Sequence, residues 1–169
     1  MRVGDVCEGF EYGTAKKSAE SGKIAVLRMG NIQKGKVIFD NLVYSNDDED
    51  IKKYNLVPGD LLFNRTNSKE WVGKTAIYEG EKKAIYAGYL VRFRPICIVS
   101  KYLNYVMQTQ YYWSFCQRER TDAIGQSNIN AQKLKRFCFP LPPIEEQHRI
   151  VTKIEELLPY CERLSAEVK

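Results

Sequence analysis

A cluster of prolines followed at once by a long amphipathic segment constrains this chain more than any other feature. Residues 139–164 read FPLPPIEEQHRIVTKIEELLPYCERL. Proline has no backbone N–H to donate and favours extended geometry in the residue before it, so the segment ending at Pro142 is predicted to be extended. Pro143 suits the first turn of a helix, and Glu145 and Glu146 then lie near the positive end of the helix dipole. We therefore predict a hinge and then a helix over about 144–169.

The apolar residues of the predicted helix recur at alternating spacings of four and three, which is the heptad repeat of coiled coils. They are Ile150, Ile154, Leu157, Cys161, Leu164 and Val168, here called the heptad seam, and Val151 and Leu158 widen it. At ~1.5 Å per residue the helix is roughly 39 Å long, which is more than one domain needs to close its own core. We therefore expect another helix to pack against the heptad seam.

With 169 residues, 44% of them hydrophobic and 28% charged, the chain suits one globular domain with an appendage. No apolar run approaches the ~20 residues of a membrane helix, and the first residues lack the apolar core of a signal peptide, so the expected location is the cytoplasm. The five cysteines are scattered, and with the single histidine, His148, they do not show zinc-ligand spacing. We expect reduced thiols and no metal site.

Short apolar runs separated by Gly, Pro and polar turns indicate a largely β domain. Strands are predicted at 3–7, 23–29, 36–44, 60–63, 71–78 and 137–139, one or two strands at 83–95, and loops at 8–21 and 125–130. Helices are predicted from Ser100, around Trp113, and from a cap at Asn130 through Leu134, while the acidic run 47–50 is a solvated loop or a helix start. The predicted fold class is α+β: a mixed, mostly antiparallel β domain over 1–142 with short flanking helices, followed by a long C-terminal coiled-coil-type helix over 143–169.

The positive charge of the chain is concentrated in its predicted globular part. The net charge is +5, but residues 1–143 hold 22 Lys and Arg against 15 Asp and Glu, whereas residues 144–169 hold 4 against 6. Basic surfaces attract polyanions, because Lys and Arg displace the counterions condensed on phosphates. The imbalance is compatible with a nucleic-acid partner, although many basic domains bind none.

Two polar segments carry the side chains that base recognition requires. Arginine matches guanine with a forked pair of donors, and Asn or Gln matches adenine. The first segment is Asn64, Arg65, Thr66, Asn67, Ser68 and Lys69, and the second holds Gln126, Ser127, Asn128 and Asn130. Either segment could equally be an ordinary solvated turn, and Asn and Ser also cap helices. Candidate DNA contacts outside these segments are Lys16, Lys17, Arg28, Asn31 and Lys74, and also Arg92 and Arg94, which equally suit the solvated face of a strand.

The sequence offers little with which to build a catalytic site. His148 stands beside Arg149 on the predicted helix, where a surface position explains it better than a role as general base. Walker A, GxGxxG and NPPY-like or DPPY-like methyltransferase motifs are absent from the sequence. We therefore do not expect an enzyme, and we expect the chain itself to use no cofactor.

The hinge and helix resemble the segment that closes a target recognition domain in the DNA specificity subunits of type I restriction-modification systems. The resemblance is carried by Pro140–Pro143, Glu145, Glu146, Gln147, Ile150 and Val151. It extends over most of the chain through Gly4-Asp5, Gly30-Asn31-Ile32, PGDLLF at 58–63, an Arg-containing polar loop leading to Gly73, and GQSNIN at 125–130. The resemblance implies a recognition domain with a spacer helix, which selects the double-stranded DNA site at which partner subunits methylate or cut.

The same resemblance implies a modification (methyltransferase) subunit that uses S-adenosylmethionine and a restriction subunit that uses ATP. The usual specificity subunit has two recognition domains and two spacer helices, whereas this chain shows one of each. We expect either a fragment that pairs with a second specificity half or a half-length subunit that forms a homodimer through its helix. The rival interpretations are a protein-interaction adaptor without specific DNA readout and a small RNA-binding domain, which no RNP-like or KH-like glycine pattern supports.

The charge imbalance generates a first prediction. The affinity of the chain for duplex DNA should fall steeply between low and physiological salt, because each phosphate contact releases counterions. Fluorescence anisotropy of a labelled duplex across a salt series measures this dependence. An affinity that stays flat over that range would contradict phosphate binding.

Overall fold

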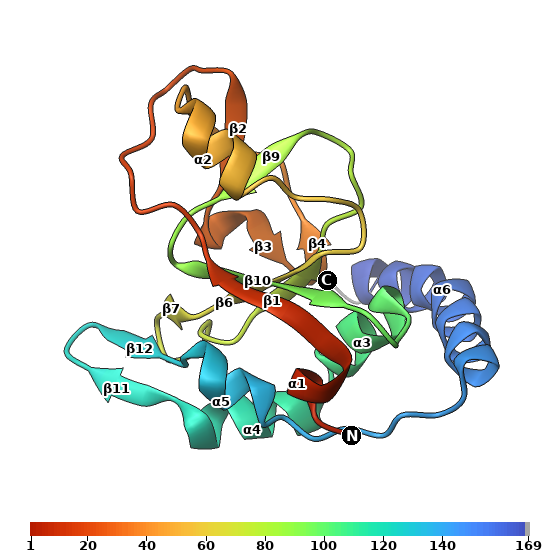
Figure 1. Ribbon diagram of the computed structural model, residues 1–169. Helices are drawn as coiled ribbons and strands as arrows, with labels where there is room; N and C mark the ends of the chain where they lie inside the picture. The colour runs from red at the N-terminus through yellow and green to blue at the C-terminus, as the bar shows by residue number, and fades with distance from the viewer. Residues whose placement is uncertain (168–169) are drawn as a thin grey trace.

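The centre of the molecule is a six-stranded sheet with the strand order β1-β10-β6-β8-β4-β3 (Figure 1). A computed structural model describes residues 1–167, without the side chains at 162, 165 and 167. The strands of this central sheet are β1 (Cys7–Tyr12), β10 (Leu90–Pro95), β6 (Leu61–Asn64), β8 (Thr75–Ile77), β4 (Gly35–Val37) and β3 (Ile32–Gln33). All neighbouring pairs are antiparallel except β4 and β8, which run parallel.

Two three-stranded sheets flank the central sheet. The first has the order β5-β2-β9 and consists of β5 (Val43–Ser45), β2 (Ile24–Leu27) and β9 (Ala84–Tyr86), with the 3-10 turn η1 (Met29–Asn31) and helix α2 (Asp48–Lys53) beside it. The second consists of β11 (Thr121–Ala123), β12 (Gln126–Asn128) and β7 (Thr66–Asn67), and its β11-β12 hairpin projects from the body in Figure 1. The predicted α+β class with mostly antiparallel strands is confirmed.

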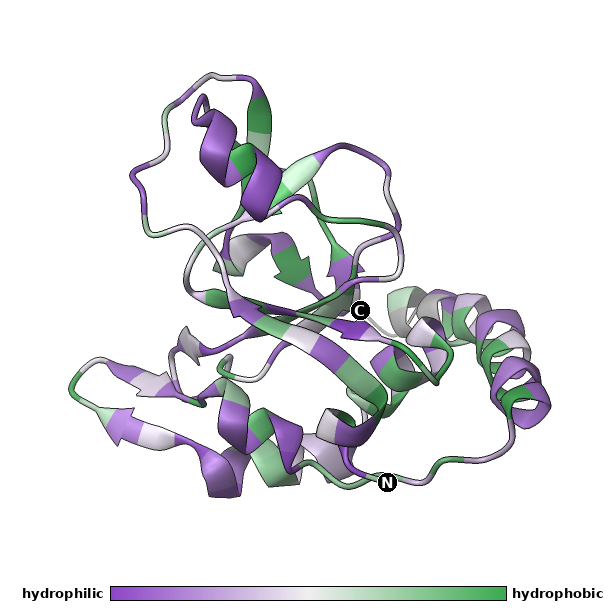
Figure 2. Ribbon diagram, in the orientation of Figure 1, coloured by the Kyte–Doolittle hydropathy of each residue, from purple (hydrophilic) through white to green (hydrophobic). Residues whose placement is uncertain are grey.

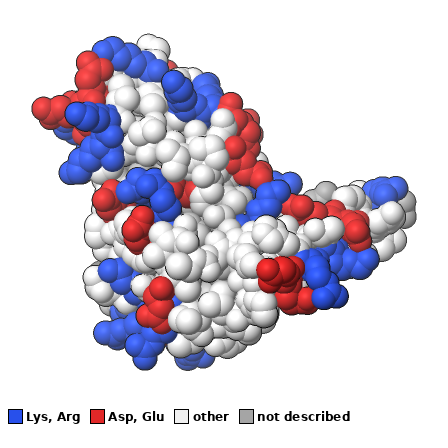
Figure 3. Space-filling model, turned by 45° about the vertical axis from the view of Figure 1, so that its right-hand side comes forward, with Lys and Arg blue, Asp and Glu red and all other residues white. Residues whose placement is uncertain are grey.

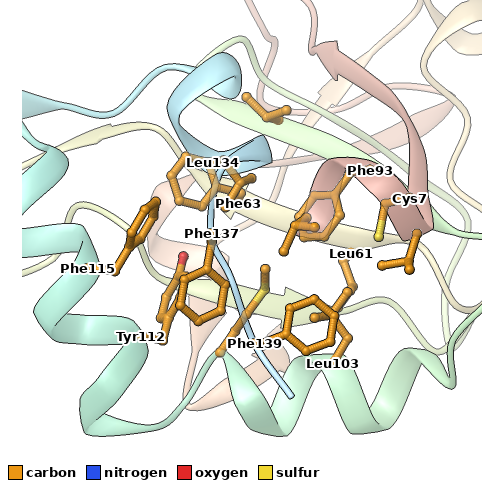
Figure 4. Close-up of a cluster of buried hydrophobic side chains, with 14 of the residues drawn as sticks. Cys7, Leu61, Phe63, Phe93, Leu103, Tyr112, Phe115, Leu134, Phe137 and Phe139 are labelled. Carbon is orange, nitrogen blue, oxygen red and sulfur yellow. The ribbon is translucent and has the colours of Figure 1, made fainter. Parts of the chain in front are cut away.

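Alternate residues of β6 belong to two different apolar clusters, one on each face of the central sheet, and a third cluster of Ile24, Val26 and Ile85 lies in the β5-β2-β9 sheet. Leu61 and Phe63 belong to the first cluster and Leu62 to the second, as expected when successive side chains of a strand point to opposite faces. The first cluster is covered by α1 (Val3–Val6), α3 (Ser100–Val106), α4 (Gln110–Glu119) and α5 (Ala131–Lys135) (Figure 4). The second cluster includes Leu27 of β2 and Tyr86 of β9, so it joins the central sheet to the β5-β2-β9 sheet.

Several local predictions are wrong, because side-chain and tertiary contacts override the sequence pattern. The predicted strand at 3–7 is mostly the helical turn α1, whose start is closed by a hydrogen bond from the Arg2 backbone N–H to the Asp5 carboxylate (3.1 Å). The predicted loop at 8–21 contains most of β1, and the predicted loop at 125–130 contains β12. The predicted strand at 137–139 is only an isolated bridge between Cys138 and Arg2, flanked by backbone hydrogen bonds that join Phe137 to Val3 and Phe139 to Met1.

Side-chain caps confirm the predicted helix start at Asn130 and decide between the two alternatives for the acidic run. The Asn130 side-chain oxygen accepts a hydrogen bond from the Lys133 backbone N–H (2.9 Å) and begins α5. The Asp47 carboxylate accepts from the Asp50 backbone N–H (2.9 Å), so the acidic run is a helix start.

Helix α6 (Ile144–Glu167) follows the hinge as predicted and begins by packing against its own domain. Gln147 is 2% exposed; its carbonyl oxygen accepts from the Val99 backbone N–H (2.9 Å) and its amide donates to the Pro142 carbonyl (2.9 Å). Val151 is buried in the first core cluster, and Glu155 pairs with Lys101 of α3 (2.7 Å). The first half of α6 is therefore fixed to α3.

The heptad seam divides along α6. Ile150 and Ile154 are half-buried, whereas Leu157 and Leu164 are 51% and 62% exposed and Cys161 is exposed as well. Val168 lies outside the described residues. Figure 2 shows hydrophobic and hydrophilic residues interleaved around this helix. No helix in the described part of the chain combines the length and hydropathy needed to cross a membrane.

The aromatic packing predicts which core residue is most sensitive to substitution. The ring of Phe137 lies 5.0 Å from those of Tyr112 and Phe115, and the side chain is 1% exposed (Figure 4). Phe137→Ala should lower the free energy of unfolding by about 3–5 kcal/mol, because it leaves a cavity. The control Tyr160→Ala, at a 59% exposed position of α6, should change it by less than about 0.5 kcal/mol. Urea denaturation measures both, and equal losses would contradict the assignment of the core.

Candidate nucleic-acid interface

The two polar segments singled out in the sequence lie side by side in the fold. Strands β7 and β12 pair antiparallel, with Asn67 opposite Ser127 and Thr66 opposite Asn128. The Asn128 side-chain amide donates to the Thr66 hydroxyl (2.7 Å). The Ile129 backbone N–H donates to the Arg65 carbonyl (2.9 Å), which extends the contact beyond the two strands. Residues about sixty positions apart in the chain therefore form one continuous surface.

The candidate residues of these segments divide into an inner and an outer set. Asn64, Thr66 and Ser127 form the inner set, with exposed fractions of 0%, 7% and 0%. The outer set is exposed or half-buried and consists of Arg65, Asn67, Ser68, Lys69, Gln126, Asn128 and Asn130. The inner side chains support the small sheet and do not face solvent, so only the outer set can meet a ligand on this surface.

The buried amide of Asn64 stands at the end of β6. Neither its side-chain oxygen nor its nitrogen has a hydrogen-bond partner among the described residues. Its backbone is fixed by bonds with Lys74 and Gly73 (2.8 and 2.9 Å). Gly73 has φ +99°, and a Cβ there would lie 2.6 Å from the sulfur of Cys116, so the loop following the first segment requires glycine.

Cations at this surface lie against exposed aromatic rings. The Arg65 guanidinium lies 4.6 Å from the centre of the Tyr12 ring, and the Lys74 ammonium lies 3.9 Å from the centre of the Trp71 ring. Partial burial lowers the pKa of Lys74 below its ordinary value. The sequence did not identify Tyr12 and Trp71 as candidates, because neither residue belongs to a recognisable binding motif.

The base of the β11-β12 hairpin carries an acid between two cations. Asp122 lies 3.4 Å from the Lys69 ammonium and 3.1 Å from Nε of Arg120. The Ser127 hydroxyl donates to Asp122 (2.6 Å), and this hydrogen bond, together with the two cations, holds the pKa of that carboxyl below its usual value. Lys69 is thus partly neutralised, and Arg120 is a further cation at this surface that the sequence did not single out.

The candidates outside the two segments are spread over other parts of the fold. Lys16 pairs with Asp47 (2.7 Å), and Lys17 is exposed in the loop before β2. Arg28 is exposed and donates to the Asn41 carbonyl (2.8 Å). Asn31 is 3% exposed and donates to the Ile38 carbonyl (2.8 Å), so it serves a turn. These positions belong to the part of the chain around β2 and η1, away from the paired segments.

Of the two alternatives for Arg92 and Arg94, phosphate contact or the solvated face of a strand, the solvated face does not hold for Arg92, which is 9% exposed and pairs with Glu11 (2.6 Å). Arg94 is half-buried and reaches the buried carboxylate of Asp60 (2.8 Å). Both pairs stabilise the sheet. On the face shown in Figure 3, Lys and Arg side chains alternate with Asp and Glu instead of forming one basic stripe.

No metal centre is visible in the part of the chain that the structure describes. It holds no group of three or more His, Cys, Asp or Glu side chains suited to a metal ion. Cys7 and Cys116 are buried, and burial raises the pKa of each thiol to about 12, which suppresses the reactive thiolate. His148 is exposed on α6, as predicted.

The curated relatives of this chain are specificity subunits. It is 36% identical over 152 residues to a protein assigned as the specificity subunit of the type I restriction enzyme MjaX of Methanocaldococcus jannaschii, covering 86% of this chain and 36% of that protein. It is 27% identical over 171 residues to the StySPI specificity subunit of Salmonella potsdam, covering 97% of this chain and 36% of that protein. The chain thus spans little more than a third of the length of these relatives.

Solved structures and a family model agree with these relatives. The fold is similar to that of the HsdS subunit from Thermoanaerobacter tengcongensis, with a TM-score of 0.70 at 18% identity over 99% of this chain and 39% of that one. A family model described as the type I restriction modification DNA specificity domain matches residues 1–168. The chain therefore belongs to the type I restriction-modification DNA specificity domain family.

Proposed function

We propose that this chain recognises a DNA sequence on behalf of a type I restriction-modification system. The observation that carries the proposal is the pairing of β7 with β12, which gathers two polar segments into one surface. Arg65, Asn67, Gln126 and Asn128 supply forked donors and acceptors on that surface, the groups that distinguish base pairs in the major groove. The family to which the chain belongs supports DNA as the ligand.

Phosphate contacts would complete the interface around the base-reading groups. Lys69, Lys74 and Arg120 lie at or beside the paired segments, and Lys17 and Arg28 are exposed cations near β2. Such contacts fix the register of a protein on DNA without reading its sequence. We assign Asn31, Asn64, Thr66 and Ser127 a supporting role, because they are buried.

We propose that catalysis belongs to partner subunits. The modification subunit would bind S-adenosylmethionine and methylate the site, and the restriction subunit would use ATP and cut, while this chain holds them at the recognised sequence. The proposed division of labour places the recognition domain at 1–142 and a spacer helix at 143–169. With such partners the chain would act in the cytoplasm.

We further propose that the exposed half of the heptad seam packs against a second helix. Leu157, Cys161 and Leu164 leave an apolar stripe on α6 beyond the part fixed to α3. An antiparallel copy of α6, or the helix of a second specificity half, would cover it, and each buried Leu contributes roughly 1.5–3 kcal/mol. A homodimer with two-fold symmetry would recognise a palindromic split site whose gap depends on helix length.

Selection from randomised duplex DNA tests the proposed function. The chain, together with its methyltransferase subunit, is incubated with a duplex library, and the bound fraction is sequenced. Enrichment of one short motif is the expected result. A library that emerges without enrichment would overturn DNA recognition and favour a protein-interaction adaptor.

The half-buried Arg65 on the paired segments gives a prediction about specificity. Arg65→Ala should cost about 1–3 kcal/mol of binding free energy on the enriched sequence and much less on unrelated DNA, because a base contact is lost. Arg149→Ala, at an exposed position of α6, is the matched control and should leave both affinities unchanged. An equal loss of affinity on all sequences would reduce Arg65 to a phosphate contact.

The heptad seam gives a prediction about assembly. Leu157→Glu should dissociate a helix-paired dimer without unfolding the recognition domain, because a charge would be buried in an apolar contact. Thr152→Glu adds the same charge at an exposed polar position of α6 and should leave the dimer intact. Sedimentation velocity with circular dichroism measures assembly and folding. A monomeric unmodified chain at tens of micromolar would exclude the homodimer and leave pairing with a second specificity half.

A further inference from the structure

Arg65 differs from its neighbouring arginines in what its guanidinium contacts. Three other arginines of the domain form ion pairs with carboxylates: Arg92 with Glu11, Arg94 with Asp60 and Arg120 with Asp122. Arg65 has no such partner among the described residues and lies instead over the ring of Tyr12, with 4.6 Å between its Cζ and the ring centre. Its charge is therefore supported by a π face, which leaves its hydrogen-bond donors uncommitted.

The guanidinium nitrogens of Arg65 differ in their exposure to solvent. Its Nε is buried and has no hydrogen-bond partner in the described part of the chain. The two terminal nitrogens are not among the buried atoms and donate to no described acceptor, so they reach the surface. The terminal nitrogens thus retain contact with solvent, whereas Nε is buried.

Tyr12 is itself fixed by two elements. It is the last residue of β1 and pairs with Val91 of β10, the strand that separates β1 from β6. Its hydroxyl accepts a hydrogen bond from the Ala131 backbone N–H at the start of α5 (3.4 Å). These contacts place the ring against Arg65, and Tyr12 as a whole remains 41% exposed.

The backbone of Arg65 is held on both sides as well. Its N–H donates to the Tyr89 carbonyl (3.0 Å), and its carbonyl accepts from the Ile129 N–H (2.9 Å). With the backbone and the guanidinium plane both restrained, little side-chain freedom remains to be lost when a ligand binds. Pre-organisation of this kind strengthens binding by reducing the entropy lost on association.

We infer that Tyr12 is a positioning residue, which holds the Arg65 fork in the plane needed to read a guanine through its O6 and N7 acceptors. The inference rests on the proposed function and adds to it the base that Arg65 recognises and the residue that orients Arg65. Guanine is the base whose major-groove edge offers two adjacent acceptors to such a fork. Lysine cannot replace arginine in this arrangement, because its ammonium has no planar pair of donors.

The test compares variants on duplexes enriched from the randomised library by the unmodified chain with its methyltransferase subunit. Each guanine of the enriched motif is replaced in turn by 7-deazaguanine, which removes the N7 acceptor. We expect one replacement to weaken binding by roughly tenfold in the unmodified chain and to have no effect on Arg65→Ala. Tyr12→Leu should lose most of that discrimination, whereas Tyr12→Phe, which keeps the ring, should retain it.

Nitrogen-15 relaxation of the Arg65 Nε–H in the unmodified chain provides a second measurement that needs no variant. A side chain held by Tyr12 should show an order parameter near the ~0.85 of rigid backbone, and a value below ~0.6 would overturn the inference. Unchanged discrimination in Tyr12→Leu, or an equal loss on every duplex, would also overturn it while leaving DNA recognition in place. A library without any enriched motif would overturn the proposed function and this inference together.

Discussion

The backbone pairing of β7 with β12 is the contact on which the candidate interface depends. Each strand is only two or three residues long, and neither is stable alone. Their neighbours fix them: the Arg65 N–H bonds to Tyr89 at the start of β10, and the Ile129 N–H bonds to Arg65. The polar segments are thus anchored to the central sheet, and their outer side chains reach solvent from that frame. A rigid frame that carries exchangeable polar groups suits a recognition domain.

The hinge motif serves the domain as well as the helix. Gln147 is buried where α6 begins, and its amide bonds both to Val99, the residue that precedes α3, and to the hinge at Pro142. Val151 then completes the core cluster around Phe137 and Phe139. The direction in which α6 leaves the domain is therefore set by buried contacts, and among the described residues of the heptad seam Leu157, Cys161 and Leu164 remain exposed. A helix that leaves the domain in a fixed direction would hold a partner on its far end at a set distance from the domain.

The sequence predicted the elements whose signals are local and left out those that depend on tertiary contacts. Asn130 gave its helix start and the prolines gave the hinge, while the acidic run fitted either a loop or a helix start. Strands β7 and β12 were predicted as loops, because two polar residues form a strand only when a distant partner is present. The site shows the same dependence on tertiary contacts. Arg65 was identified from its chemistry, but Tyr12 was missed, because it lies on β1, which only β10 brings close to β6.

Hydroxyl-radical footprinting of the chain, free and bound to its enriched duplex, tests most directly whether this surface meets DNA. Tyr12 and Tyr89 adjoin Arg65 and are 41% and 54% exposed, while Tyr111 on α4 and Tyr160 on α6 are 56% and 59% exposed and lie on other elements. Our account predicts that DNA suppresses oxidation of Tyr12 and Tyr89 and leaves Tyr111 unchanged. Protection of Tyr111 or Tyr160 with Tyr12 and Tyr89 still reactive would contradict it.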